Sequence, residues 1–150
     1  MLTIAADFQA VLLRELEGLQ REIGLYPDEE TLWTTRPGVT NSAGNLALHI
    51  SGNLQHFIGG VLGGRSFQRD RDAEFGRRSG TREEVMEQVR RTIAVVREVL
   101  PGLTEEQLDA PFEAHPDVRA STRRFLLHLC THTAFHVGQV PYFLDRLKNT

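Results

Sequence analysis

Two histidines near the C-terminus have the spacing of a metal site. His132 and His136 are four positions apart, slightly more than one turn of an α-helix, so both rings leave the same face if this segment is helical. Two imidazoles at that spacing can bind one divalent ion, as they do in the His-Glu-x-x-His metalloproteases. The glutamate of that motif is absent, so the spacing favours metal binding and gives no support to a protease.

A zinc-type site needs a third ligand, because such sites usually take three or four protein donors. His49 is the best candidate, since it lies between Leu46 and Asn53 beside the apolar stripe of a second predicted helix. His56 follows His49 by seven residues, which is about 10 Å along a helix and too far to bind the same ion.

The neighbouring polar residues have weaker signals. His128 precedes His132 by four residues, but three histidines at this spacing drift around the helix, and the outer two differ by about 80°. We therefore expect His128 to flank the site. Asn53 could polarise a ligand or substrate, or it could be a buried amide bonded to backbone. The pattern identifies no catalytic acid, base or nucleophile, and Cys130 is predicted to be a small buried hydrophobe.

The elements that must position these residues are helices. Apolar residues recur every three or four positions in four segments, approximately residues 3–25, 42–62, 81–100 and 121–148, as in amphipathic helices. On the last segment both histidines fall on the stripe expected to face the core. Thr81 and Glu84 have the spacing of a capping box, a short helix is predicted after Thr104, and Pro141 is expected to kink the last helix.

The connections complete the predicted fold. Trp33 is expected to pack at the end of the bundle, and residues 65–80, which carry mixed charges, are predicted to be a solvated loop long enough to cross over. No strand-period segment of useful length is found. The sequence therefore predicts an all-α four-helix bundle with a long crossover connection, formed by a single domain over residues 1–150.

Composition limits the class of protein. Of 150 residues, 40% are apolar and 25% are charged, with a formal net charge of −3, which is typical of a globular protein and gives no global attraction to nucleic acid. Three arginine pairs, at positions 77–78, 90–91 and 123–124, are interpreted as solvated surface. No segment could span a bilayer, and the N-terminal residues do not resemble a signal peptide. We expect a cytoplasmic protein that acts on a small molecule, without nucleic-acid or membrane partners.

Two motifs connect the sequence to a known family. Residues 41–54, Asn-Ser-Ala-Gly-Asn-Leu-Ala-Leu-His-Ile-Ser-Gly-Asn-Leu, and residues 132–140, His-Thr-Ala-Phe-His-Val-Gly-Gln-Val, resemble the DinB-like (DinB/YfiT-like) superfamily in order, separation and helical setting. The similarity covers nearly the whole chain, although Pro141 departs from the family pattern. It implies a four-helix bundle with a long crossover, a homodimer, and a three-histidine site of His49, His132 and His136 for a divalent ion, zinc or nickel.

The resemblance also implies a class of reaction. Characterised relatives include transferases that use bacillithiol or mycothiol and a mycothiol-dependent maleylpyruvate isomerase. The prediction is a metal-dependent, thiol-dependent transferase, or a related isomerase or hydrolase, in which the site activates a low-molecular-weight thiol or water. Two alternatives stay open: a non-catalytic, metal-stabilised ligand-binding or stress-related bundle, and a protein without metal whose histidines bond to each other or to water.

Overall fold

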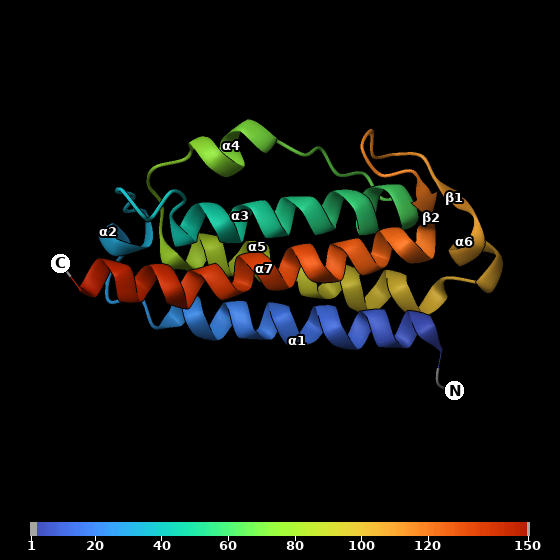
Figure 1. Cartoon of the computed structure of the whole chain (residues 1–150), viewed down its shortest axis with the longest axis horizontal. Coiled ribbons are helices and arrows are strands. Elements are labelled where there is room, and N and C mark those ends of the chain that lie inside the picture. Colours follow the sequence, from blue (N-terminus) through green and yellow to red (C-terminus); the bar gives the residue numbers. More distant parts are fainter. Residues whose placement is uncertain (1–2, 150) are drawn as a thin grey trace.

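Four long helices form the body of the molecule in the computed structural model, which describes residues 3–149. They are α1 (Ile4–Gly24), α3 (Ala43–Leu54), α5 (Arg82–Val99) and α7 (Thr122–Lys148). Helices α1 and α3 each pack against both α5 and α7, so the four form a closed ring around one core (Figure 1). The predicted four-helix bundle is confirmed. Residues 1, 2 and 150, which belong to the predicted domain, lie outside the described residues.

Hydroxyl side chains begin all four bundle helices. Thr3, Ser42, Thr81 and Ser121 each accept a hydrogen bond from a backbone N–H three residues further on, which satisfies one of the free donors of the first turn. At Thr81 the side chain of Glu84 bonds back to the cap, so the predicted capping box is present. The hydroxyl residue that precedes each apolar stripe therefore predicted the start of each bundle helix correctly.

The second bundle helix changes its hydrogen-bond pattern halfway. After Leu54 it continues as a π-helix, η1 (Gln55–Leu62), and the N–H of Gly63 still bonds to the carbonyl of Ile58, five residues back, at 2.8 Å. The predicted helix over residues 42–62 is present, but the apolar periodicity did not indicate that its second half is a π-helix. Because the π turns come after His49, the regular α-helical part of the element sets the position of that histidine.

The last helix passes through its proline. Helix α7 is continuous from Thr122 to Lys148 with Pro141 inside it (Figure 1). The hydroxyl of Tyr26, which follows α1, donates a 2.7 Å hydrogen bond to the carbonyl of Val140 directly before the proline. This bond ties the proline turn to the start of the next connection, and both histidines of α7 lie on its N-terminal side.

The connection between α3 and α5 crosses the bundle. It runs back over α3, so that α5 begins at the same end of the bundle as α3 and runs parallel to it (Figure 1). A short helix, α4 (Arg71–Gly76), lies in its middle. The predicted crossover is present, and most of its residues are exposed as predicted. The prediction missed two features: α4 packs against α3, and Glu74 of α4 is only 5% exposed.

The remaining elements close the two ends. Trp33 is buried, as predicted, and its indole N–H donates to the carbonyl of Gly80 at 2.9 Å. The short elements are α2 (Glu29–Leu32), the 3-10 turn η2 (Leu100–Gly102), α6 (Glu105–Asp109), and the antiparallel pair β1 (Pro111–Phe112) and β2 (Ala120–Ser121). The helix predicted after Thr104 is α6. The two-residue strands are too short to leave an alternating pattern in the sequence.

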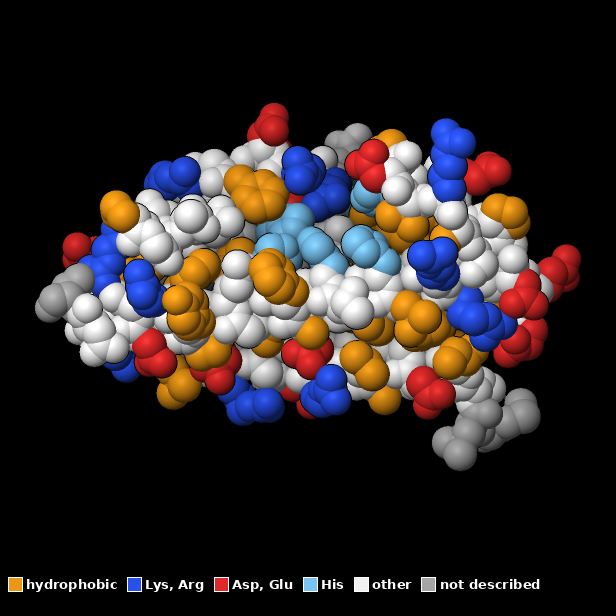
Figure 2. Space-filling view, in the orientation of Figure 1, with side chains coloured by type: hydrophobic (Ala, Val, Ile, Leu, Met, Phe, Trp, Pro, Cys, Tyr) orange, Lys and Arg blue, Asp and Glu red, His pale blue; other side chains and the backbone are white. Residues whose placement is uncertain are grey.

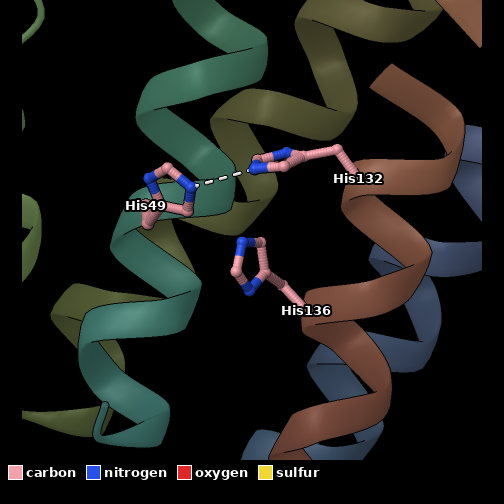
Figure 3. Close-up of side chains that lie close together, drawn as sticks. All are labelled: His49, His132 and His136. Carbon is pink, nitrogen blue, oxygen red and sulfur yellow. Dashed lines mark hydrogen bonds between the residues drawn. The ribbon is translucent and has the colours of Figure 1, made fainter. Parts of the chain in front are cut away.

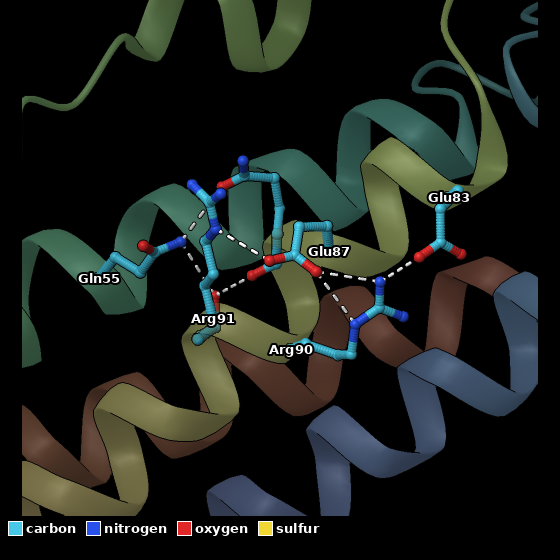
Figure 4. Close-up of polar contacts among 7 residues, drawn as sticks. Gln55, Glu83, Glu87, Arg90 and Arg91 are labelled. Atoms are coloured by element: carbon cyan, nitrogen blue, oxygen red, sulfur yellow. Dashed lines mark hydrogen bonds and ion pairs between the residues drawn. The ribbon is translucent and has the colours of Figure 1, made fainter.

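Each of the three arginine pairs predicted to be solvated has an exposed member, and at least one arginine of each pair forms an ion pair with an acidic residue. On α5, Arg90 pairs with Glu83 and Glu87, and Arg91 also pairs with Glu87 (Figure 4). On the inner side of α5, the hydroxyl of Thr92 accepts a 3.2 Å hydrogen bond from the side-chain amide of Gln55, which belongs to η1. The ion pairs offset the positive charge of both Arg90 and Arg91. Within residues 3–149, no helix is both long and apolar enough to cross a bilayer.

Candidate metal centre

The structure brings together the three histidines that the sequence singled out. His49 extends from α3 and His132 and His136 extend from the adjacent helix α7, all toward one gap (Figure 3). One nitrogen from each ring lies within 4.8 Å of the others. The His49 and His132 rings face each other through their Nε2 atoms at 3.2 Å, so helix packing places residues 83 positions apart in the chain in direct contact.

The spacing of the nitrogens fits a divalent ion. Two imidazole ligands of a tetrahedral zinc ion, each bound at 2.0–2.1 Å, have nitrogens about 3.3 Å apart. The 3.2 Å between the Nε2 atoms of His49 and His132 matches this value, and His136 stands within 4.8 Å as the third donor. An all-imidazole donor set suits zinc, nickel and copper.

The three rings differ in exposure. His49 is 4% exposed, whereas His132 and His136 are half-buried. The sequence placed both α7 histidines on the core-facing stripe, but they lie at its edge, and Figure 2 shows histidine side chains reaching the surface in the middle of the face. The buried stripe of α7 runs beside them through Leu129, Thr133, Val137 and Val140.

The α7 rings are uncharged near neutral pH. Burial, together with the neighbouring His136 and His49, lowers the pKa of His132 to about 3. Burial also lowers the pKa of His136, and a hydrogen bond to Gln139 only partly offsets the effect. A neutral imidazole has the free lone pair that a metal requires, so these rings can bind an ion without first losing a proton.

A carboxylate on the crossover determines the tautomer of His49. Glu74 Oε1 lies 3.0 Å from His49 Nδ1, and because a carboxylate can only accept, Nδ1 carries the proton and Nε2 keeps its lone pair toward His132. Arg69 donates to both oxygens of Glu74, at 2.8 and 2.9 Å. Burial alone would raise the pKa of Glu74, but the hydrogen bonds from His49 and Arg69 outweigh it and lower the pKa.

The two histidine rings of α7 differ in the hydrogen bonds that their Nδ1 atoms form. His136 Nδ1 lies 2.7 Å from the amide oxygen of Gln139, so it also carries a proton and leaves Nε2 free for a ligand. His132 Nδ1 is buried and has no hydrogen-bond partner within residues 3–149. His136 therefore keeps the nitrogen that faces the gap available, whereas no described residue holds the proton of His132 on Nδ1, and its Nε2 can donate to His49 until an ion displaces that proton to Nδ1.

The comparison with protein families agrees with this geometry. A family model described as the DinB superfamily matches residues 7–140. The chain belongs to the DinB superfamily. The matched range contains the four bundle helices almost completely and includes His49, His132 and His136. A search of the curated proteins found no match.

Two residues predicted to support the site in this DinB-superfamily protein do not bond to its histidines. The amide oxygen of Asn53 is buried without a partner within residues 3–149, and His128 is exposed, with its ring stacked 5.9 Å from that of His132. Glu74 and Gln139 take the hydrogen-bonding role. Gln139 lies three residues after His136, a helical spacing that could have revealed it. Glu74 lies in a charged connection that gave no such signal.

Cys130 lies outside the site of the DinB-superfamily bundle. The thiol is buried, as the sequence predicted, and burial raises its pKa to about 11. A thiol with that pKa is protonated at neutral pH and is a poor nucleophile. It therefore acts as an apolar side chain of the core.

Proposed function

We propose that this protein binds a divalent ion, zinc or nickel, through His49, His132 and His136 and uses it to transfer a small thiol to an electrophilic substrate. The composition of the cluster carries the proposal. Among residues 3–149 it has three imidazoles and no fourth His, Cys, Asp or Glu donor. Structural zinc sites are normally closed by four protein ligands, whereas catalytic sites keep one position open.

The chain's own residues would each have a defined task in this reaction. The three histidines hold the ion, and the partial exposure of His132 and His136 gives reactants access from solvent. Glu74 and Gln139 keep the Nδ1 protons of His49 and His136 in place. A divalent ion there would supply Lewis acidity, which lowers the pKa of a thiol or water that binds to it.

The thiol is expected to be a separate cosubstrate. The chain has one cysteine, and Cys130 is buried with a raised pKa, so it does not supply the nucleophile. In the proposed transfer the thiol sulfur forms a bond to an electrophilic carbon, the bond from that carbon to its leaving group breaks, and the thiol proton leaves with that group. The thiol-dependent activities implied by the sequence motifs support this reaction over hydrolysis.

The test uses tag-free protein whose metal content is known from elemental mass spectrometry. Protein loaded with zinc or nickel is assayed with bacillithiol, mycothiol or glutathione as the thiol and an organic halide as the electrophilic substrate. We expect turnover with at least one thiol, loss of turnover after chelation, and recovery when metal is restored. A protein that holds metal but turns over none of the three thiols would be a metal-stabilised bundle without this activity. Failure to bind metal after reconstitution would remove the site itself.

A further inference from the structure

Three side chains of the crossover surround His49, and we call Arg69, Glu74 and Phe75 the His49 clamp. Glu74 bonds to His49 Nδ1, Arg69 bonds to Glu74, and the ring of Phe75 lies 4.6 Å from the imidazole. The crossover therefore contacts the histidine on an edge and on a face. None of these residues belongs to the three-histidine cluster.

The ion pair of the clamp lies inside the protein. The side chains of Glu74 and Arg69 are 6% and 14% exposed, and both carboxylate oxygens are bonded. Isolated burial of a carboxylate is costly, and it is tolerated when the charge is paired and its lone pairs are satisfied. A surface loop that only linked α3 to α5 would not need a buried charge pair aimed at a histidine.

A glycine on α3 makes the space for this carboxylate. A Cβ atom added at Gly52 would lie 2.7 Å from Cδ of Glu74 and closer still to one oxygen, well inside van der Waals contact. Gly52 is in the middle of a helix, where glycine is unfavourable relative to alanine by about 1 kcal/mol. The position is therefore adapted to the approach of Glu74 and not to helix stability.

We propose that Glu74 is a positioning residue for the metal site, held by Arg69 in the space that Gly52 leaves open. Its carboxylate keeps the proton on His49 Nδ1 and fixes the ring, so that the Nε2 lone pair points toward His132 and His136. Partners of this kind orient a ligand histidine and raise its basicity, and their loss typically weakens metal binding 10- to 100-fold. The inference rests on the proposed metal site but not on the thiol reaction.

Two variants test the role of Glu74 from different directions. Gly52→Ala displaces the carboxylate without altering any polar group, and Glu74→Gln keeps its size while removing its charge. The matched controls are Gly18→Ala, at a helical glycine whose added Cβ would meet only ordinary contacts, and Glu98→Gln, in the exposed pair with Arg65. Each protein is titrated with zinc against a chelator of known affinity, and the visible spectrum of its cobalt form is recorded.

We expect zinc binding to weaken at least tenfold in Gly52→Ala, to weaken less in Glu74→Gln, and to stay within twofold of wild type in both controls. The cobalt spectrum should change in Gly52→Ala and in Glu74→Gln, because the ligand field depends on the orientation of the His49 ring. A lower melting temperature with unchanged zinc affinity and an unchanged cobalt spectrum would overturn the proposal and leave the clamp a structural contact. If the wild-type protein binds neither ion, the proposed function fails and the inference fails with it.

Discussion

His49 on α3 and the histidine pair on α7 face each other across one gap, but the protein holds the two sides by different means. His49 is 4% exposed and is bonded to a buried carboxylate that comes from a different segment of the chain. His132 and His136 are half-buried, and the one hydrogen bond to their Nδ1 atoms within residues 3–149 comes from Gln139 on the same helix.

The difference indicates which side of the site is rigid. An imidazole enclosed by a charge pair and an aromatic ring cannot rotate without breaking several contacts, whereas the half-buried rings of α7 are held by fewer hydrogen bonds and can adjust at smaller cost. We expect the α3 side to define where the ion binds and the α7 side to adapt to it. Substitutions on the two sides should therefore differ in their effects.

The largest effect is expected when the α7 side loses both rings. The variant His132→Ala/His136→Ala keeps His49 and its clamp but leaves one imidazole, which is too few donors for stable binding of zinc or nickel. Metal content measured by elemental mass spectrometry should fall from about one ion per chain to almost none. Equal metal in the parent and the variant would show that the ion binds somewhere else.

The second effect concerns stability on the α3 side. In Arg69→Leu the carboxylate of Glu74 stays buried without its cation, and breaking a buried pair in this way costs about 3–5 kcal/mol. The control Arg65→Leu removes an exposed pair with Glu98, which is expected to cost less than about 1 kcal/mol. Urea unfolding of the metal-free proteins measures both free energies. Similar losses in the two variants would contradict a buried, energetically important clamp.

The third effect is a pH dependence that comes from the α7 side. The folded-state pKa of His132 is about 3, below its ordinary value of 6.5, so the unfolded chain binds the proton first as pH falls. The free energy of unfolding of the metal-free protein should therefore decrease below pH 6.5, by up to about 1.4 kcal/mol per pH unit for this group. His136 acts in the same direction, whereas Glu74 contributes only below its ordinary pKa of 4.5.

Chemical unfolding between pH 7 and 5 measures this dependence, because the window lies above the range in which Glu74 titrates. The variant His132→Gln should show a flatter dependence than the wild-type protein. If both proteins lose stability at the same rate, the burial of His132 is not the cause.

The smallest effect is expected at Gln139. Its side chain is half-buried, so in Gln139→Ala water can take over the hydrogen bond to His136 Nδ1. Zinc affinity measured by chelator competition should decrease less than tenfold, and less than in Gly52→Ala. A larger loss at Gln139 than at Gly52 would reverse the comparison and make α7 the side that defines the site.

The sequence by itself determined the features that depend on neighbours along the chain. The spacing of His132 and His136, the hydroxyl caps at Thr81 and Ser121, and the apolar periodicity of the bundle helices all reflect helical geometry, which repeats every 3.6 residues and can be recognised in one segment. The pairing of His49 with the α7 histidines was also predicted, with the help of the family motifs.

Only the tertiary structure decided how His49 is held. Glu74 lies 25 residues from it in the chain, within a run of mixed charges that is typical of a solvated loop. A carboxylate becomes buried when its cation and its hydrogen-bond donors converge in space, and no local pattern reports that convergence. The glycine at position 52 has a similar explanation, because its missing side chain is understood only when Glu74 of the crossover is seen to occupy the space beside it.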